Sequence, residues 1–188
     1  KEAKKSFEKG SEQLAKKKFA DAQKSLEKAV EIYPKFAAAW AALGSAYLAQ
    51  DSTERALEAL NKSIEADARY VTPYLDLMQI HARRGSWEEA ARASHRVIQL
   101  NSVQYPQAFY VNAAANFNLK NYAEAESVAR EAVRLDTGHR FPRAEYVLGL
   151  TLAIRNENTE AAQYLRSFIS RTPETQLDTV KKQVLRGL

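Results

Sequence analysis

Small and apolar residues recur along this chain at the spacing of amphipathic helices, and the pattern repeats about every 34 residues. The alanine that opens the second helix of each copy recurs at intervals of 34, 34, 35 and 36 residues, as Ala22, Ala56, Ala90, Ala125 and Ala161. Small or apolar side chains follow four and seven positions later, on the same helix face. The pattern predicts five helix–turn–helix repeats, at about residues 3–36, 37–70, 71–105, 106–141 and 142–175.

The first helix of each predicted repeat carries a mostly small residue at the point where the second helix crosses closest. These positions are Gly10, Gly44, Met78, Ala113 and Gly149, of which Met78 is the poor fit. A bulky residue is expected four positions earlier, where the chain has Ser6, Trp40, Tyr74, Phe109 and Glu145. Polar residues stand there in the two terminal copies only, as is typical of the ends of a repeat array.

Signals at the helix ends agree with this register. Ser86-x-x-Glu89 and Asn121-x-x-Glu124 are typical of capping boxes at the start of second helices, and Asp51-x-x-Glu54 indicates the same one residue earlier. After Pro173, an apolar stripe predicts one more amphipathic helix over about residues 174–187. This helix is interpreted as a cap on the last repeat, with a truncated sixth repeat as the alternative.

The segment Trp40-x-x-Leu43-Gly44-x-x-Tyr47, followed by Ala56, Leu60 and Ala68, resembles the tetratricopeptide repeat family. The resemblance covers about residues 3–175, almost the whole chain. It implies an all-α fold, a right-handed superhelical α-solenoid of five repeats plus a C-terminal capping helix, forming a single domain over residues 1–188. It also implies a concave wall of first helices that holds peptides or partner helices.

The composition fits a folded helical chain. Apolar residues make up 45% of the 188 residues and charged residues 27%. The absence of Cys excludes disulfide bonds and thiolate chemistry. No apolar run approaches the roughly 20 residues that span a bilayer, so we expect no transmembrane segment. Because the chain starts at Lys1 without a Met, we expect a fragment of a longer protein.

The net charge of +5 is concentrated at the ends of the chain, and residues 1–36 alone hold ten basic and six acidic residues. A basic N-terminal repeat that binds nucleic acid or an anionic membrane surface is therefore an alternative function. Glu2, Glu8 and Glu12 are interleaved with the lysines at helical spacing, which favours a solvated helix face. We do not expect nucleic acid to be the main partner.

Projection of the first helices places polar and aromatic residues on the expected concave face. The candidate ligand-binding residues are Phe7, Leu75, Asp76, Gln79, Arg83, Tyr110, Phe117, Asn118, Arg143 and Tyr146. Similar proteins that grip the C-terminal carboxylates of heat-shock chaperones use Lys, Asn and Arg at set points of three first helices. Those points carry Phe7, Ser11, Ala42, Thr72 and Asp76 here, so chaperone-tail binding is disfavoured.

Asn112 and Asn116 lie one helical turn apart, where the family usually has Leu and Tyr. One interpretation is an amide ladder that binds the backbone of a ligand. The others are a buried pair satisfied within the repeat, or a local loosening between repeats three and four, because unpaired buried amides are costly.

No set of residues shows the convergence that catalysis needs. His81 takes a packing position, His95 lies in mid-helix and His139 lies in a turn, and no two of them have the spacing of a metal site. We therefore predict a non-enzymatic protein–protein interaction scaffold or adaptor whose groove, from Leu75 to Ile154, holds a peptide or helix. Neither a cofactor, a metal nor a small-molecule substrate is expected, and self-association is a further alternative.

Overall fold

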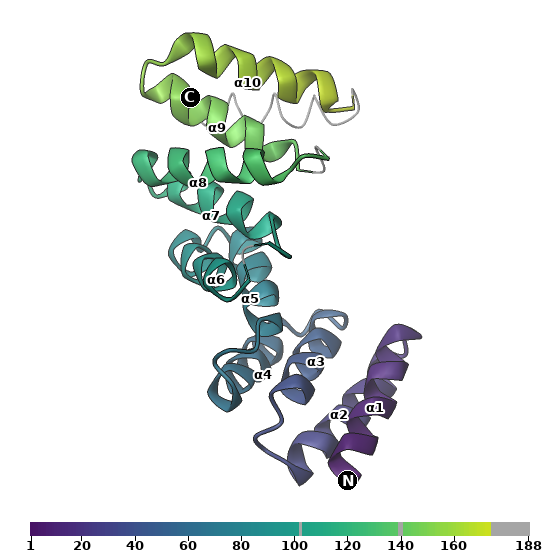
Figure 1. The fold of residues 1–188 in the computed structure, drawn as a ribbon. Helices are drawn as coiled ribbons and strands as arrows, with labels where there is room; N and C mark the ends of the chain where they lie inside the picture. The colour runs from purple at the N-terminus through teal and green to yellow at the C-terminus, as the bar shows by residue number, and fades with distance from the viewer. Residues whose placement is uncertain (102, 139–140, 174–188) are drawn as a thin grey trace. The chain divides into compact units, whose positions relative to one another are not determined.

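The computed structural model describes residues 1–101, 103–138 and 141–173, and within these ranges it contains ten α-helices and no strand (Figure 1). The prediction of an all-α fold is confirmed. The predicted C-terminal helix at about residues 174–187 and the predicted turn at His139 lie outside the described residues.

The chain divides into two compact units, residues 1–81 and 82–188, and the boundary falls inside one helix, α5 (Thr72–Arg84). The expectation that all five repeats form a single domain stays a prediction.

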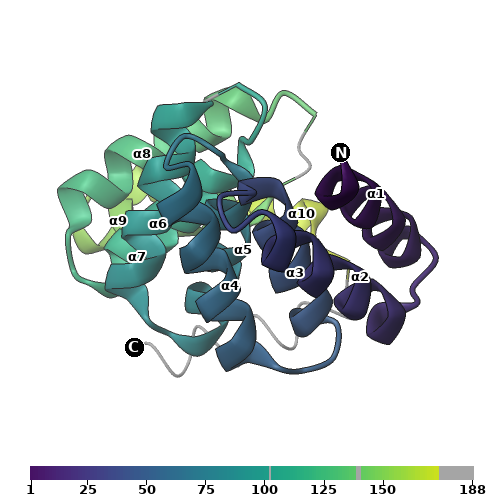
Figure 2. The ribbon, with the colours of Figure 1, turned by 90° about the horizontal axis from the view of Figure 1, so that it is seen from below.

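The N-terminal unit consists of two complete helix pairs and the first ten residues of α5. Its complete helices are α1 (Glu2–Ala15), α2 (Phe19–Ile32), α3 (Ala37–Leu48) and α4 (Thr53–Ala66). Helix α2 packs against α1 and α3, and α3 packs against α4 and also contacts α1. Figure 2 shows α1 and α2 side by side in a second view.

Small residues allow the helices of each pair to approach closely. A Cβ atom added at Gly44 would lie 2.9 Å from Cγ of Leu60, and one added at Gly10 would lie 2.6 Å from Cγ of Leu26. Leu26 and Leu60 are completely buried. The prediction of a close helix crossing at these glycines is therefore confirmed in the N-terminal unit.

The C-terminal unit continues the alternation of first and second helices. After the end of α5 it contains α6 (Trp87–Leu100), α7 (Gln107–Asn118), α8 (Tyr122–Leu135), α9 (Arg143–Ile154) and α10 (Asn158–Arg171). Each of these five helices packs against the next, and the two first helices α7 and α9 also contact each other. Leu148 and Leu152 are fully buried in its core, and Gly149 approaches Leu165 as Gly44 approaches Leu60.

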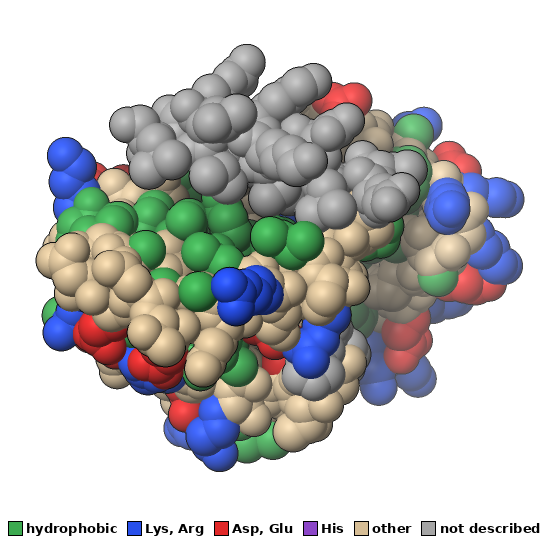
Figure 3. All heavy atoms as spheres, turned by 90° about the horizontal axis from the view of Figure 1, so that it is seen from above, with side chains coloured by type: hydrophobic (Ala, Val, Ile, Leu, Met, Phe, Trp, Pro, Cys, Tyr) green, Lys and Arg blue, Asp and Glu red, His purple; other side chains and the backbone are tan. Residues whose placement is uncertain are grey.

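Figure 3 looks onto the end of the C-terminal unit that α9 and α10 form. Hydrophobic side chains gather on part of this face, with charged side chains toward its edges. Ile154 and Ile169, on α9 and α10, are about half exposed, at 47% and 53%. In the part of the chain that is described, no helix is long and apolar enough to cross a membrane.

The turn inside each repeat contains one residue in the left-handed region of backbone space. These residues are Lys17, Asp51, Gly85, Lys120 and Asn156, with φ between 56° and 72°. They recur at the same intervals as the alanines, and only Gly85 adopts this φ without the steric cost of a Cβ atom. All five repeats therefore have the same turn geometry, although the residue type at the left-handed position differs between them.

The predicted capping boxes are wrong. Ser86 and Asn121 do precede α6 and α8, but neither side chain caps the helix, and Asp51 lies one residue before the N-cap residue Ser52. Gly85 and Lys120, the left-handed residues, come directly before Ser86 and Asn121, whose ψ angles are 74° and 64°. An N-cap side chain reaches the N–H groups of the first turn from a more extended backbone, so these two side chains do not cap their helices. The Asn121 amide instead donates to Oδ1 of Asn116, at 3.4 Å.

Candidate functional site

Four of the ten predicted ligand-binding residues lie in the N-terminal unit. Phe7 is half-buried, and its ring packs against that of Phe36 with centroids 4.9 Å apart. Leu75 and Asp76 of α5 are half-buried, whereas Gln79 is exposed. Phe7 is therefore engaged in packing, while α5 presents a polar side chain to solvent.

Asp76 is tied to the preceding first helix. The Ser45 hydroxyl of α3 donates to Oδ2 of Asp76 at 3.1 Å. Burial raises the pKa of Asp76 above its ordinary value, and the hydrogen bond from Ser45 opposes that rise. A carboxylate at this place makes a polar link between α3 and α5.

The other six predicted residues lie in the C-terminal unit and fall into two groups. Arg83, Asn118 and Arg143 are exposed, whereas Tyr110, Phe117 and Tyr146 are half-buried. The Asn118 amide donates to the Ala114 carbonyl of its own helix at 2.8 Å. Exposed polar side chains and partly covered aromatic rings thus alternate on the predicted face of this unit.

The three half-buried aromatic residues take part in packing. Tyr110 and Phe117 lie against a buried cluster that contains Leu148. The Tyr146 ring lies 5.0 Å from the ring of Phe168 in α10, and burial raises the pKa of Tyr146. Each ring keeps only part of its surface available for a ligand.

Asn112 and Asn116 of α7 form a buried hydrogen-bonded chain. The Asn112 amide donates to the Ala91 carbonyl and to Oγ of Ser94, both at 3.0 Å. The Asn116 amide donates to the carbonyl and to Oδ1 of Asn112, also at 3.0 Å. Asn112 is 4% exposed and Asn116 8%, so the interpretation as a satisfied buried pair holds and the ligand ladder does not. The pair joins α7 to α6.

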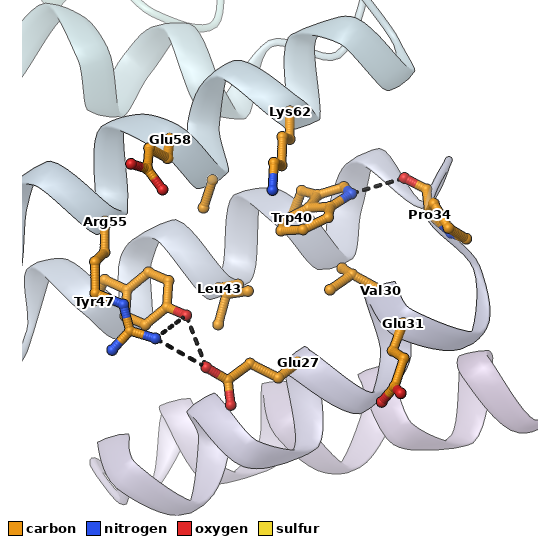
Figure 4. A pocket seen from close by; sticks show the side chains of 11 residues that line it. Glu27, Val30, Glu31, Pro34, Trp40, Leu43, Tyr47, Arg55, Glu58 and Lys62 are labelled. Atoms are coloured by element: carbon orange, nitrogen blue, oxygen red, sulfur yellow. Dashed lines mark hydrogen bonds and ion pairs between the residues drawn. The ribbon is translucent and has the colours of Figure 1, made fainter.

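A surface pocket of about 500 Å³ lies in the N-terminal unit between α2 and α4, with α3 as its floor (Figure 4). None of the predicted ligand-binding residues lines it. Leu43 of α3, Val30 of α2 and Ala59 of α4 form its buried apolar base. We call it the α2–α4 groove.

One end of the α2–α4 groove is closed by a hydrogen-bonded triad. The Tyr47 hydroxyl donates to Oε1 of Glu27 at 2.8 Å, and Nη2 of Arg55 donates to the same carboxylate at 3.2 Å and to the Tyr47 oxygen at 2.8 Å. The Arg55 guanidinium also lies over the Tyr47 ring, 4.2 Å from its centroid. Burial, with the Glu27 carboxylate as a further cause, raises the pKa of Tyr47 to about 12.

The other end of the groove presents an indole ring. Trp40 donates from Nε1 to the Pro34 carbonyl at 2.7 Å, and Nζ of Lys62 lies 4.7 Å from the ring centroid. Glu31 and Glu58 line the groove from α2 and α4. Neither carboxylate makes a hydrogen bond or an ion pair with the residues that the structure describes. The groove therefore combines an apolar base, an aromatic face and unpaired negative charge.

The α2–α4 groove is not recognisable from the sequence because its charged residues share no local motif. Glu27 and Arg55 are 28 positions apart, and each belongs to a helix face that looks solvated when it is considered alone. The repeat register does contain a signal for this pair. Glu27 lies five positions after Ala22 and Arg55 lies one position before Ala56, and residues at these two register positions meet across neighbouring second helices.

Some lysines of the first repeat form ion pairs with glutamates of the same or the neighbouring helix. Lys16 bonds to Glu12 at 2.6 Å and lowers the pKa of that carboxyl, and Lys28 pairs with Glu2 at 3.1 Å. A shallow pocket between α1 and α2 still gathers four lysines: Lys5, Lys9, Lys24 and Lys28. The N-terminal repeat therefore keeps one basic depression.

The described ranges contain no candidate metal centre. No group of three or more His, Asp or Glu side chains there could hold a metal ion. His81 is half-buried, and His95 is exposed and bonds to Gln99 at 2.9 Å.

Two family models described as tetratricopeptide repeat match the chain, over residues 13–80 and 75–140. No curated protein sequence matches it.

Several solved structures share its fold. YrrB, described as a TPR protein with an unusual peptide-binding site, has a TM-score of 0.81 and 20% identity, over 95% of this chain and 90% of YrrB. A MamA protein has a TM-score of 0.76 and 21% identity, over 95% and 94% of the two chains. The pilF protein of Pseudomonas aeruginosa has a TM-score of 0.70 and 22% identity, over 92% and 77%. At these identities the likeness shows the fold alone, whereas the family models cover more than half of the sequence. The chain belongs to the tetratricopeptide repeat family.

Proposed function

We propose that this chain is a non-enzymatic adaptor that holds a peptide or a partner helix against its first helices, chiefly α7 and α9. The observation that carries the proposal is the face of these two contacting helices, where exposed Asn118 and Arg143 flank half-buried Tyr110, Phe117 and Tyr146. Rigid, partly covered aromatic rings with a polar rim are what interfaces use as anchors.

The family supports the general role. Tetratricopeptide repeats, together with neighbours such as YrrB and MamA, support a protein-interaction scaffold, and members of the family are typically non-catalytic interaction modules. The description of YrrB names a peptide-binding site. A protein or peptide is accordingly the class of partner that we propose for this chain.

The shape of the ligand follows from the alternation on the first helices. Side chains from two neighbouring helices offer several shallow contacts in a row, and such a surface fits an extended strand or one face of a helix better than a small molecule. Arg83 and Arg143 add positive charge, so we expect a ligand with at least one carboxylate near its apolar anchor residues.

The second candidate is binding of an anionic polymer or membrane by the N-terminal repeat. The observation in its favour is the pocket between α1 and α2 with its four lysines. Binding of this kind weakens steeply with added salt, because phosphate contacts release counterions. An affinity for duplex DNA or anionic vesicles that is flat in salt would dismiss it.

A display screen of random and genome-derived peptides tests the main proposal. The chain is screened beside a first-helix variant, Arg83→Glu with Asn118→Ala and Arg143→Glu, which changes exposed side chains and leaves the aromatic packing intact. A control variant, Arg92→Glu with Gln163→Ala and Arg166→Glu, makes the same charge change on exposed positions of the second helices α6 and α10.

We expect peptides that are enriched on the natural chain and on the control variant, and lost on the first-helix variant. Equal enrichment on all three proteins would contradict the proposal, and so would enrichment that only the control variant loses.

A further inference from the structure

We propose that the α2–α4 groove is a second binding site of this protein, and that it takes the side chain of an arginine in a peptide. The groove lies in the N-terminal unit and uses two second helices, so it is independent of the first-helix surface proposed above.

The base of the groove fits the aliphatic part of such a side chain. Leu43, Val30 and Ala59 are at most 6% exposed as whole residues and form the base between the two charged rims. An arginine buries its methylene groups on apolar surface of this kind while its charged end stays at the rim.

The indole face of the groove already attracts a cation. Lys62 places Nζ 4.7 Å from the centroid of the Trp40 ring, and it makes no ion pair with the described residues. Lys62 therefore occupies the position over the Trp40 ring that we propose for the cation of a ligand. A guanidinium is planar and more weakly hydrated than an ammonium group, so it stacks on an indole ring at a lower desolvation cost.

The rims supply negative charge that the protein leaves unbalanced. Glu27 is engaged by Arg55 and Tyr47, whereas Glu31 on α2 and Glu58 on α4 have no partner among the described residues. Figure 4 shows the two carboxylates on opposite sides of the groove. A guanidinium in the groove is attracted by both carboxylates and donates to whichever of them lies nearer.

The last two repeats have the same kind of bridge between second helices, with the two charges exchanged, but they lack the flanking carboxylates. In the repeat register, Arg130 of α8 stands where α2 has Glu27, and Glu160 of α10 stands where α4 has Arg55. These two side chains form a bidentate bridge of 2.6 and 3.0 Å. The positions of Glu31 and Glu58 carry Arg134 and Gln163 there, so this pair of carboxylates is absent between α8 and α10.

The test follows the indole N–H of Trp40 by NMR during titration of the whole chain with the blocked peptide acetyl-Ala-Arg-Ala-amide. The protein has two tryptophans, and Trp87→Phe assigns the two indole signals. Because Trp40 donates to the Pro34 carbonyl at the edge of the groove, its signal reports directly on occupation. We expect a saturable shift of the Trp40 signal, no shift of the Trp87 signal, and a much smaller effect from acetyl-Ala-Leu-Ala-amide.

Three variants separate this site from general attraction between charges. Glu31→Gln with Glu58→Gln is expected to weaken binding about fivefold, since each exposed pair contributes modestly. Lys62→Met is expected to strengthen it about two- to threefold by removing the internal competitor. Glu65→Gln, an exposed carboxylate of α4 that does not line the groove, is expected to leave it unchanged.

Absence of a saturable Trp40 shift would overturn the proposal. It would also be overturned by an equal response to the leucine peptide, or by equal effects of the Glu65 variant and the Glu31, Glu58 double variant. The first-helix variant should bind the arginine peptide normally, so failure of this proposal is distinguishable from failure of the adaptor function.

Discussion

At the scale of single residues, the left-handed positions show where the repeat stores strain. Lys17, Asp51, Lys120 and Asn156 adopt a positive φ that disfavours any residue with a Cβ atom, and Asn and Asp tolerate it better than Lys does. Only Gly85 is free of this cost. The turn is therefore imposed by the packing of the two helices that it joins.

Replacement of Lys120 by Gly is expected to stabilise the protein. Relief of the left-handed strain outweighs the entropy that a glycine loses on folding, by about 0.5–1 kcal/mol. Chemical denaturation measures the change. Ala123→Gly, at an exposed position in the first turn of α8, is the matched control and is expected to destabilise by up to about 1 kcal/mol. A Lys120→Gly protein no more stable than the natural one would contradict this explanation of the turn.

Asp76 makes stability depend on pH in a defined direction. Burial raises its pKa in the folded state, so the folded protein holds this proton more tightly than the unfolded chain does. Protonated Asp76 therefore stabilises the folded state at pH values below about 3.9, the pKa of an aspartate in the unfolded chain. This stabilisation is lost as the pH rises through the higher pKa that Asp76 has in the folded protein.

Asp76→Asn removes this titration and keeps an oxygen for the Ser45 hydroxyl. We expect the variant to gain stability over the natural protein at neutral pH, and the gain to shrink toward acid pH. Urea denaturation across that range measures the difference. A difference that is the same at every pH would show that Asp76 does not titrate in this way.

At the scale of helices, the sequence pattern predicts the elements well because the signal is repeated. Close crossings at Gly10, Gly44 and Gly149 follow from a small residue at one place on a helix face, which is visible in the order of residues. The capping boxes failed because the backbone of the preceding turn, and not the side chain at the N-cap position, sets the local geometry.

The candidate sites could be predicted only in part. The first-helix face follows from helical projection, but the degree of burial of Tyr110, Phe117 and Tyr146 depends on neighbouring helices. The α2–α4 groove depends on side chains 28 residues apart, whose contact is fixed by how α2, α3 and α4 pack. No local motif contains that information.

We expect ion pairs between neighbouring second helices to contribute more to the free energy of unfolding than ion pairs within one helix. Arg130 joins Glu160 on α10 in two hydrogen bonds, whereas Arg134 pairs with Glu131 three residues earlier on α8. In double-mutant cycles with alanine, we expect a coupling of about 1 kcal/mol for Arg130–Glu160 and no more than about 0.5 kcal/mol for Arg134–Glu131. Both should decrease with salt. Equal couplings would refute a bridging role for Arg130.

At the scale of the whole molecule, one repeat architecture carries two kinds of surface. First helices present exposed polar side chains beside partly covered aromatic rings, as in α7 and α9. Second helices bridge each other directly, as Arg130 and Glu160 do between α8 and α10 and Arg55 and Glu27 do between α4 and α2, and α2 and α4 also leave a groove beside their bridge. Because the backbone plan is the same in each repeat, differences of a few side chains decide which surface is open.

The adaptor function depends on the first-helix surface, and calorimetric titration of the strongest peptide from the display screen measures it most directly. The peptide is titrated into the natural chain, the first-helix variant and the second-helix control variant. We predict that the natural chain and the control bind with the same affinity, and that Arg83→Glu with Asn118→Ala and Arg143→Glu weakens binding at least about tenfold. An affinity that is unchanged in the first-helix variant would contradict the central claim that this protein holds its partner on its first helices.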